Sequence, residues 1–174
     1  SAGDPSLPPK PLKRLYLLVH PFFDLDGRVD DGEHPTKQAL ARKYRELAAT
    51  LKADEAMVAF PAGKDKRKPD VNALIQDLAA GLRERFLQAV DQDMGIVKGV
   101  AEGAPAFFGI RDELRRRGFP IGPDTEIVAI GETAPYCVPR VADHARQAFG
   151  TDAPGKVLLT HTDWGHDPSA SGNS

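Results

Sequence analysis

The sequence has little of what would reveal a function directly. One cysteine in 174 residues excludes an internal disulfide, and no apolar run approaches the ~20 residues of a membrane span. A net charge of −2 offers no field that would hold nucleic acid or an anionic membrane, so we predict neither partner. A persistent free thiol fits a reducing compartment. We therefore predict a cytoplasmic protein, or an exported one if its N-terminal segment is a processed end.

What is present is an ordinary globular composition. Apolar residues make up 41% of the chain, enough to build one sizeable core at this length. We see no internal repeat or domain boundary. The prediction is a single domain over residues 12–163, preceded by a flexible arm over 1–11 and followed by a polar tail over 164–174.

Apolar periodicity alternates between the patterns of strands and of helices. The predicted strands are Leu15–Val19, Ala56–Phe60, Gly95–Lys98, Glu126–Ile130 and Lys156–Thr160. The predicted helices are Thr36–Lys52, Val71–Val90, Ala106–Arg117 and Val138–Phe149. This alternation predicts a three-layer α/β sandwich with a mostly parallel sheet of about five strands.

Four chemically notable residues lie at or just beyond the ends of these predicted strands. They are His20, Lys98, Glu132 and Cys137. Ligands of open parallel sheets bind beyond the carboxyl ends of the strands, so we expect the site there.

Cys137 occupies a position that suits a reactive thiol. A β-branched run ends at Gly131, a polar turn follows, and Pro135 suits an early helical position. The sulfur should therefore lie in or near a first helical turn, where free N–H groups and the helix dipole favour the thiolate. The alternative from spacing alone is a buried structural cysteine.

Several segments together resemble the isochorismatase-like cysteine hydrolases, the group that contains nicotinamidases and N-carbamoylsarcosine amidases. The segments are Leu17 to Leu25, Gly95-Ile96-Val97-Lys98-Gly99, Pro105-Ala106-Phe107-Phe108-Gly109-Ile110, Leu114 to Phe119, Ile127 to Val138 and Ala142 to Gly150. Both the order and the spacing of these segments resemble the family, and together the segments cover roughly half of the chain.

The resemblance implies roles for individual residues. The nucleophile of the family falls on Cys137 and its catalytic lysine on Lys98, and the oxyanion would be held by the N–H groups of Thr133 and Cys137. Members of the family often have a cis peptide in this turn, which would lie between Glu132 and Thr133. The catalytic aspartate of the family is replaced by His20, which we predict to be the general base, because an ordinary histidine pKa of about 6.5 suits neutral pH.

Further residues are expected to support the site. Glu132 is placed to restore the carboxylate lost at His20, and the others are Asp24, Phe22 and Tyr136. In nicotinamidases a metal site follows the second strand, but Phe60 to Lys64 supply no such ligands here. We predict no metal and no cofactor.

The sequence thus predicts a hydrolase with a cysteine nucleophile, acting on a small amide, carbamoyl or related C–N substrate. One alternative is a catalytically altered member of the family that binds a small ligand or a protein partner. Another is a metal-dependent hydrolase that uses the potential ligands of the loop His161 to Asp167. Relatives commonly form dimers or tetramers, so the resemblance also implies a homo-oligomer.

Overall fold

The structure, a computed structural model, describes residues 9–23, 25, 35–89, 91, 94–132 and 137–164, with the backbone alone at 161 and 162. Most of the predicted N-terminal arm and C-terminal tail lies outside the described residues. None of the described helices is both long and apolar enough to cross a lipid bilayer.

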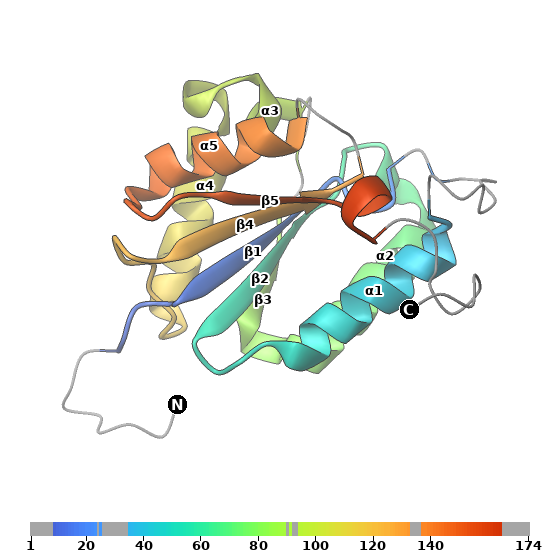
Figure 1. Cartoon of the computed structure of the whole chain (residues 1–174), viewed down its shortest axis with the longest axis horizontal. Coiled ribbons are helices and arrows are strands. Elements are labelled where there is room, and N and C mark those ends of the chain that lie inside the picture. The colour runs from blue at the N-terminus through green and yellow to red at the C-terminus, as the bar shows by residue number, and fades with distance from the viewer. Residues whose placement is uncertain are drawn as a thin grey trace.

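A five-stranded parallel sheet forms the middle layer (Figure 1). Its strands, in chain order, are β1 (Arg14–Val19), β2 (Glu55–Phe60), β3 (Phe86–Gln88), β4 (Glu126–Gly131) and β5 (Lys156–Leu159). Their order across the sheet is β3-β2-β1-β4-β5. Val19, the last residue of β1, pairs with Phe60 of β2 and with Gly131 of β4, so these carboxyl ends lie level.

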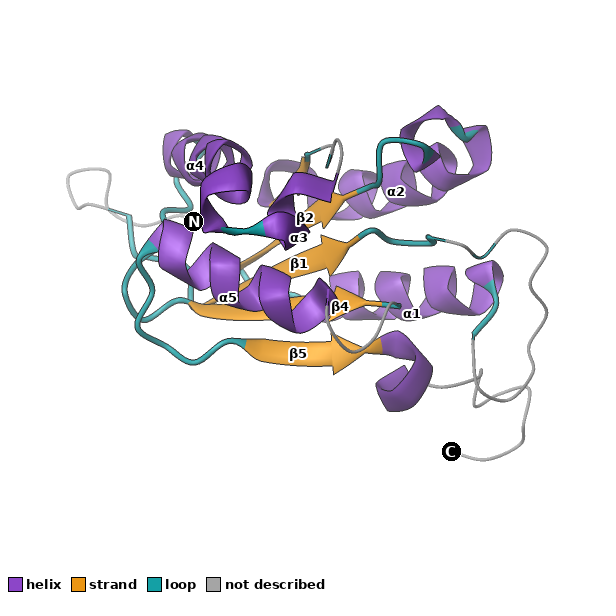
Figure 2. Ribbon diagram, turned by 90° about the horizontal axis from the view of Figure 1, so that it is seen from above, coloured by secondary structure: helices purple, strands orange, loops and turns teal. Residues whose placement is uncertain are grey.

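Helices cover both faces of this sheet. They are α1 (Lys37–Thr50), α2 (Pro69–Leu82), α3 (Gly95–Lys98), α4 (Val100–Arg116) and α5 (Cys137–Phe149). The first two lie on one face and the last three on the other (Figures 1 and 2). Successive strand residues point to opposite faces. Leu17 therefore joins the core beneath α4 and α5, and Leu18 joins the core beneath α1 and α2.

The predicted three-layer α/β architecture is confirmed, and four of the five predicted strands are present. The predicted helix Val71–Val90 is wrong beyond Leu82. The backbone turns at Arg83, with φ 56°, and Phe86–Gln88 then pairs with β2. Phe86 and Leu87 are buried in opposite cores, which two adjacent apolar residues satisfy in a strand of the middle layer.

The predicted strand Gly95–Lys98 is also wrong, because these residues form α3. Asp91 Oδ1 accepts a hydrogen bond from Ile96 N at 3.1 Å, which supports the start of this short helix. The next helix begins at Val100 and not at Ala106, and Gly103 in its first turns packs closely against Ile96. A Cβ at Gly103 would lie 3.1 Å from Ile96 Cα, so only glycine allows this approach.

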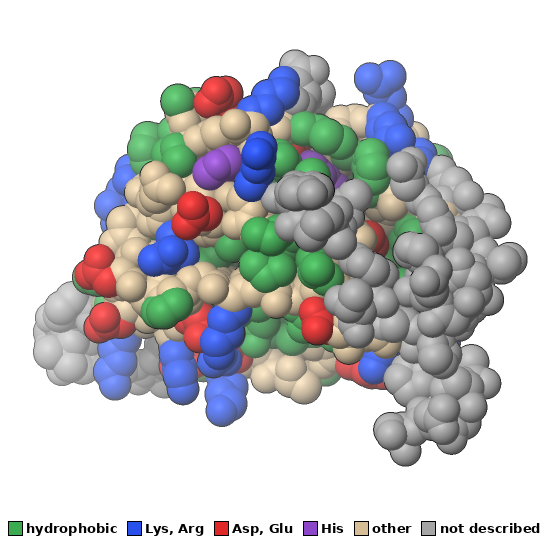
Figure 3. Space-filling view, turned by 45° about the horizontal axis from the view of Figure 1, so that its top comes forward, with side chains coloured by type: hydrophobic (Ala, Val, Ile, Leu, Met, Phe, Trp, Pro, Cys, Tyr) green, Lys and Arg blue, Asp and Glu red, His purple; other side chains and the backbone are tan. Residues whose placement is uncertain are grey.

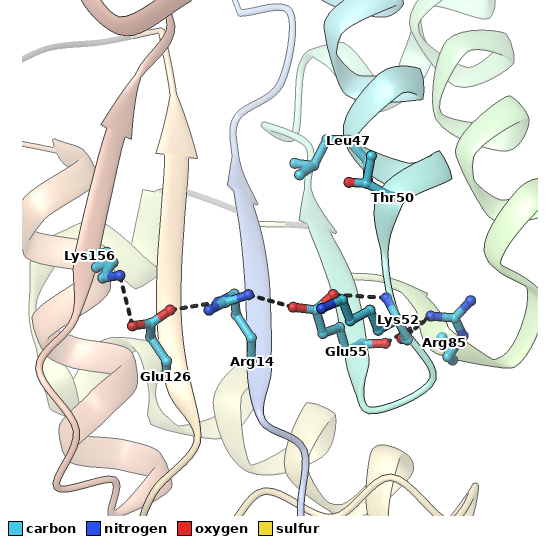
Figure 4. A network of polar contacts seen from close by, with 8 residues as sticks. All are labelled: Arg14, Leu47, Thr50, Lys52, Glu55, Arg85, Glu126 and Lys156. Carbon is cyan, nitrogen blue, oxygen red and sulfur yellow. Dashed lines mark hydrogen bonds and ion pairs between the residues drawn. The ribbon is translucent and has the colours of Figure 1, made fainter.

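Charged side chains link the strands at the opposite, amino edge of the sheet (Figure 4). Arg14 in the central strand contacts Glu55 of β2 at 2.5 Å and Glu126 of β4 at 2.6 Å. Lys156 of β5 adds a further ion pair to this row, with its Nζ 3.1 Å from Glu126 Oε2. This ladder of alternating charge holds four strands in register at the edge where they begin.

Candidate functional site

His20 is the first residue after β1 and is buried, with 1% of its surface exposed. Its N–H donates to Phe60 O at 2.9 Å, which continues the pairing with β2 for one more residue. The backbone then turns with a φ of 46° at His20 and of 67° at Phe22. Two left-handed residues that are not glycine are uncommon within so short a stretch. The chain therefore leaves the sheet abruptly at His20.

The His20 imidazole pairs with Asp91, whose carboxylate is 97% shielded from solvent. Nε2 of His20 lies 2.6 Å from Asp91 Oδ2. Asp91 follows β3 and is fixed on its other side, because its N–H donates to Pro61 O and its Oδ1 accepts from Ile96 N. Because an ionised carboxylate can only accept, this hydrogen bond places an N–H on Nε2 of the imidazole.

Sequence reasoning missed Asp91. The signal is an aspartate soon after the short apolar run Phe86-Leu87, but that run also fits the predicted helix Val71–Val90. Once Phe86–Gln88 is a strand, Asp91 follows the third strand as His20 follows the first. Both residues then lie at the carboxyl edge, where the sheet is expected to bind ligands.

Cys137 is the first residue of α5 and is partly exposed. The helix packs against β4 so closely that a Cβ at Gly131 would lie 2.7 Å from Val138 Cγ2. A hydrogen bond also links α5 to α3, since His144 Nδ1 lies 2.9 Å from Ile96 O. Ile96 binds Asp91 through its N–H, so the thiol helix and the His20–Asp91 pair share one support. Cys137 therefore belongs to the first turn of α5, whose N–H groups have no acceptor within the helix itself.

Lys98 does not lie at a strand end, and that part of the prediction is wrong. It is the last residue of α3, and its side chain is exposed. The residue that follows the third strand and reaches the neighbourhood of His20 is an acid, Asp91. A role for Lys98 in stabilising a thiolate stays a prediction.

Glu132 follows β4 at the same edge of the sheet, and its carboxylate accepts hydrogen bonds from the segment after β1 and from α1. Its Oε1 accepts from Phe22 N at 3.2 Å and from the Tyr44 hydroxyl at 2.9 Å. Burial raises the pKa of Glu132 to about 7, against the opposing effect of these hydrogen bonds, and the charge of Asp65 adds to the rise. Burial also raises the pKa of Tyr44, helped by the charge of Glu132. Two of the predicted supporting residues, Glu132 and Phe22, are thus brought into contact.

The remaining predictions lie outside the described residues. These are Asp24, Thr133, Tyr136 and the cis peptide between Glu132 and Thr133. The predicted metal alternative lies there in large part, since the structure describes neither the side chains of 161 and 162 nor residues 165–167. Among the described residues, no group of three or more His, Cys, Asp or Glu side chains is arranged to hold a metal ion.

No model of a known protein family matches the chain, and no curated protein or solved structure matches it either. Membership of the isochorismatase-like hydrolases therefore stays a prediction. The site has to be judged on its own geometry.

The arrangement offers three chemical functions along one sheet edge. Cys137 supplies a potential nucleophile, the His20–Asp91 pair supplies an oriented base, and the first turn of α5 supplies backbone donors. The surface above α5 and α3 carries apolar side chains among basic and acidic ones (Figure 3).

Proposed function

We propose that the protein is a hydrolase with a cysteine nucleophile that acts on a small amide, carbamoyl or related C–N substrate. The observation that carries the proposal is the buried His20–Asp91 hydrogen bond of 2.6 Å, at the sheet edge where Cys137 begins α5. A nucleophile, a base and a third group that orients the base make up the general logic of covalent hydrolysis.

In this proposal Nδ1 of His20 removes the thiol proton of Cys137, and Sγ attacks the substrate carbonyl carbon. Backbone N–H groups at the start of α5, that of Cys137 among them, stabilise the oxyanion. As the tetrahedral intermediate collapses, the C–N bond breaks and the His20 imidazolium returns its proton to the leaving amine. Water then attacks the thioester and gives a proton to His20. The acyl product leaves, and the thiol is restored.

Asp91 has a defined part in this cycle. Asp91 accepts the hydrogen bond from the Nε2–H group throughout, so it holds the imidazole in the useful tautomer and stabilises the imidazolium that forms. The resemblance leads one to expect a carboxylate after the first strand and a cation after the third. Here a histidine follows the first strand and an aspartate follows the third, and the two side chains form one hydrogen-bonded pair.

The experiment is hydrolysis of a panel of small primary amides and carbamoyl compounds, followed by mass spectrometry of the quenched protein. We expect turnover and an acyl adduct on Cys137, and we expect both to be absent in Cys137→Ser. Lys98→Met is the companion variant that measures whether the lysine contributes. Turnover that survives in Cys137→Ser would refute the thiol mechanism.

A further inference from the structure

Glu132 connects three segments at the carboxyl edge of the sheet. It follows β4 directly, it accepts from the backbone N–H of Phe22 beyond β1, and it accepts from Tyr44 of α1. Tyr44 is fully buried and packs edge-on against Phe22, with ring centroids 5.4 Å apart. The carboxylate therefore lies where the exit of β1, the exit of β4 and a helix meet.

The segment it binds is the turn that carries His20. Phe23 N donates to His20 O at 3.1 Å and closes the turn, while His20 and Phe22 both keep a positive φ. Such a conformation is strained for large side chains and persists only where the surroundings hold it. Burial of the Phe22 ring is one restraint, and the hydrogen bond to Glu132 is the polar one.

We propose that Glu132 is a positioning residue for His20, because its hydrogen bond to Phe22 N holds the left-handed turn that directs the imidazole onto Asp91. Its value for catalysis rests on the proposed thiol hydrolysis, whereas its effect on the His20–Asp91 contact does not. Glu132 acts through the turn, since its side chain accepts from Phe22 N and from the Tyr44 hydroxyl.

The described titratable groups that interact with Glu132 are Tyr44 from α1 and Asp65 from the short helix at 65–67. Asp65 is fully buried, and its Oδ1 lies 2.9 Å from Lys68 Nζ. The second oxygen of Glu132, Oε2, is shielded from solvent and has no hydrogen-bond partner among the described residues. A proton on Oε2 leaves Oε1 free to accept from Phe22, so acceptor geometry, and not negative charge, performs the positioning.

Three substitutions of Glu132 should differ in their effect on the turn. Glu132→Gln keeps an acceptor at the position of Oε1 and should preserve the turn. Glu132→Ala removes the acceptor, and Glu132→Asp withdraws it by one methylene while keeping the charge. Tyr44→Phe is the matched control, since it removes the other donor to Glu132 and leaves the bond to Phe22 intact.

The direct readout is proton NMR of the downfield N–H resonance expected of the short His20–Asp91 hydrogen bond, assigned by its loss in His20→Gln. We expect this resonance in the wild type, Glu132→Gln and Tyr44→Phe, and its loss or a large upfield shift in Glu132→Asp and Glu132→Ala. If the alanine variant does not fold, the aspartate variant carries the test. Turnover in Glu132→Asp should fall by about a hundredfold in kcat with little change in KM, as for a displaced base.

An unchanged resonance in a folded Glu132→Asp would overturn the inference. Loss of the resonance in Tyr44→Phe would also overturn it, since the Tyr44 hydroxyl, and not the bond from Phe22 N to Glu132, would then hold the turn. If Glu132 were purely structural, its substitution would lower the melting temperature without moving the His20–Asp91 resonance. Failure of the hydrolase proposal has a different signature, which is turnover in Cys137→Ser with the NMR results unaffected.

Discussion

At the scale of single residues, the account depends on two buried polar side chains that satisfy each other. His20 and Asp91 are both almost fully shielded, and burying either alone would cost a few kcal/mol. Asp91 uses one carboxylate oxygen for His20 and the other for the backbone N–H of Ile96. A residue at position 91 therefore needs two acceptors, which only a carboxylate provides there.

The first prediction tests this requirement with Asp91→Asn. The amide has one acceptor oxygen for two donors, so either His20 or Ile96 faces an N–H group. We expect turnover to fall by about two to four orders of magnitude, as when an orienting carboxylate is lost from a catalytic triad. Steady-state kinetics on the best substrate of the panel measures this, with circular dichroism to establish folding. Unchanged kcat would remove Asp91 from the mechanism.

A second prediction concerns Glu132 and pH. Because burial raises its pKa to about 7 in the folded protein, above an unfolded value of about 4.3, the folded state binds the extra proton between these values. Stability from this group is therefore fully present below about pH 4.3 and is lost as pH rises to about 7. A glutamine at 132 does not titrate and so escapes this loss, and Glu132→Gln should gain about 3 kcal/mol in unfolding free energy over the wild type between pH 4 and pH 8.

Urea unfolding of both proteins at pH 4 and pH 8 checks the second prediction. All other titrating groups are common to the two proteins, so the difference between their unfolding free energies reports on position 132 alone. Parallel pH dependences would show that the carboxyl group at 132 titrates alike in the folded and unfolded chain.

At the scale of elements, the site depends on how closely α5 approaches the end of β4. Gly131 permits this approach, since an added Cβ would lie 2.7 Å from Val138 Cγ2 and 3.1 Å from the carbonyl oxygen of Val19. The backbone oxygen cannot move aside cheaply. The start of α5, which carries Cys137, is thereby tied to the strand exit.

The third prediction is that Gly131→Ala pushes this helix start away from the sheet. We expect a loss of about 1–3 kcal/mol in unfolding free energy, as for an overpacked core, together with reduced turnover. Gly109→Ala is the control, because nothing lies within 4 Å of its added Cβ on α4. That variant should gain about 0.5–1 kcal/mol and keep full turnover. A neutral Gly131→Ala would show that the contact is not tight in solution.

The same elements show what the sequence could predict. Four strands, β1, β2, β4 and β5, and four helices, α1, α2, α4 and α5, follow from apolar runs and helical periodicity. The same patterns place His20, Glu132 and Cys137 at one edge of the sheet. The third strand could not be predicted, because three residues are too few to show a period and Phe86 and Leu87 also fit a helical face. Asp91 was missed for that reason, and Lys98 was misplaced because Ile96 and Val97 have the composition of a strand.

Contacts distant in sequence were also beyond prediction. The interactions of Glu132 with Phe22 and Tyr44 span 110 and 88 residues. They depend on the register of β1 against β4 and on where α1 packs, which no local pattern encodes. Sequence reasoning could name Glu132 and Phe22 separately but could not join them.

At the scale of the whole molecule, the two edges of the sheet have separate tasks. Arg14, Glu55, Glu126 and Lys156 link the strands at the amino edge, whereas the candidate site lies at the carboxyl edge. The six residues of β1 place these edges about 17 Å apart. Stability and reactivity should therefore respond to different substitutions.

The fourth prediction tests this separation with Arg14→Met. It leaves Glu55, whose side chain is 5% exposed, without its cation, and we expect a loss on the order of 3 kcal/mol in unfolding free energy. The rate at which iodoacetamide alkylates Cys137 should not change, since the ladder does not reach the site. Urea unfolding and a timed alkylation assay measure the two effects. A changed alkylation rate would mean that the edges are coupled.

The most direct test of the central claim, that Cys137 is activated by His20 and Asp91, is the rate of iodoacetamide alkylation of Cys137 at pH 7 in the folded protein. The account predicts a rate at least about tenfold above that of glutathione in the same buffer, because a thiolate is the reacting species, and a fall toward the glutathione rate in His20→Gln. Alkylation of the wild type no faster than glutathione, or equally fast in His20→Gln, would contradict it.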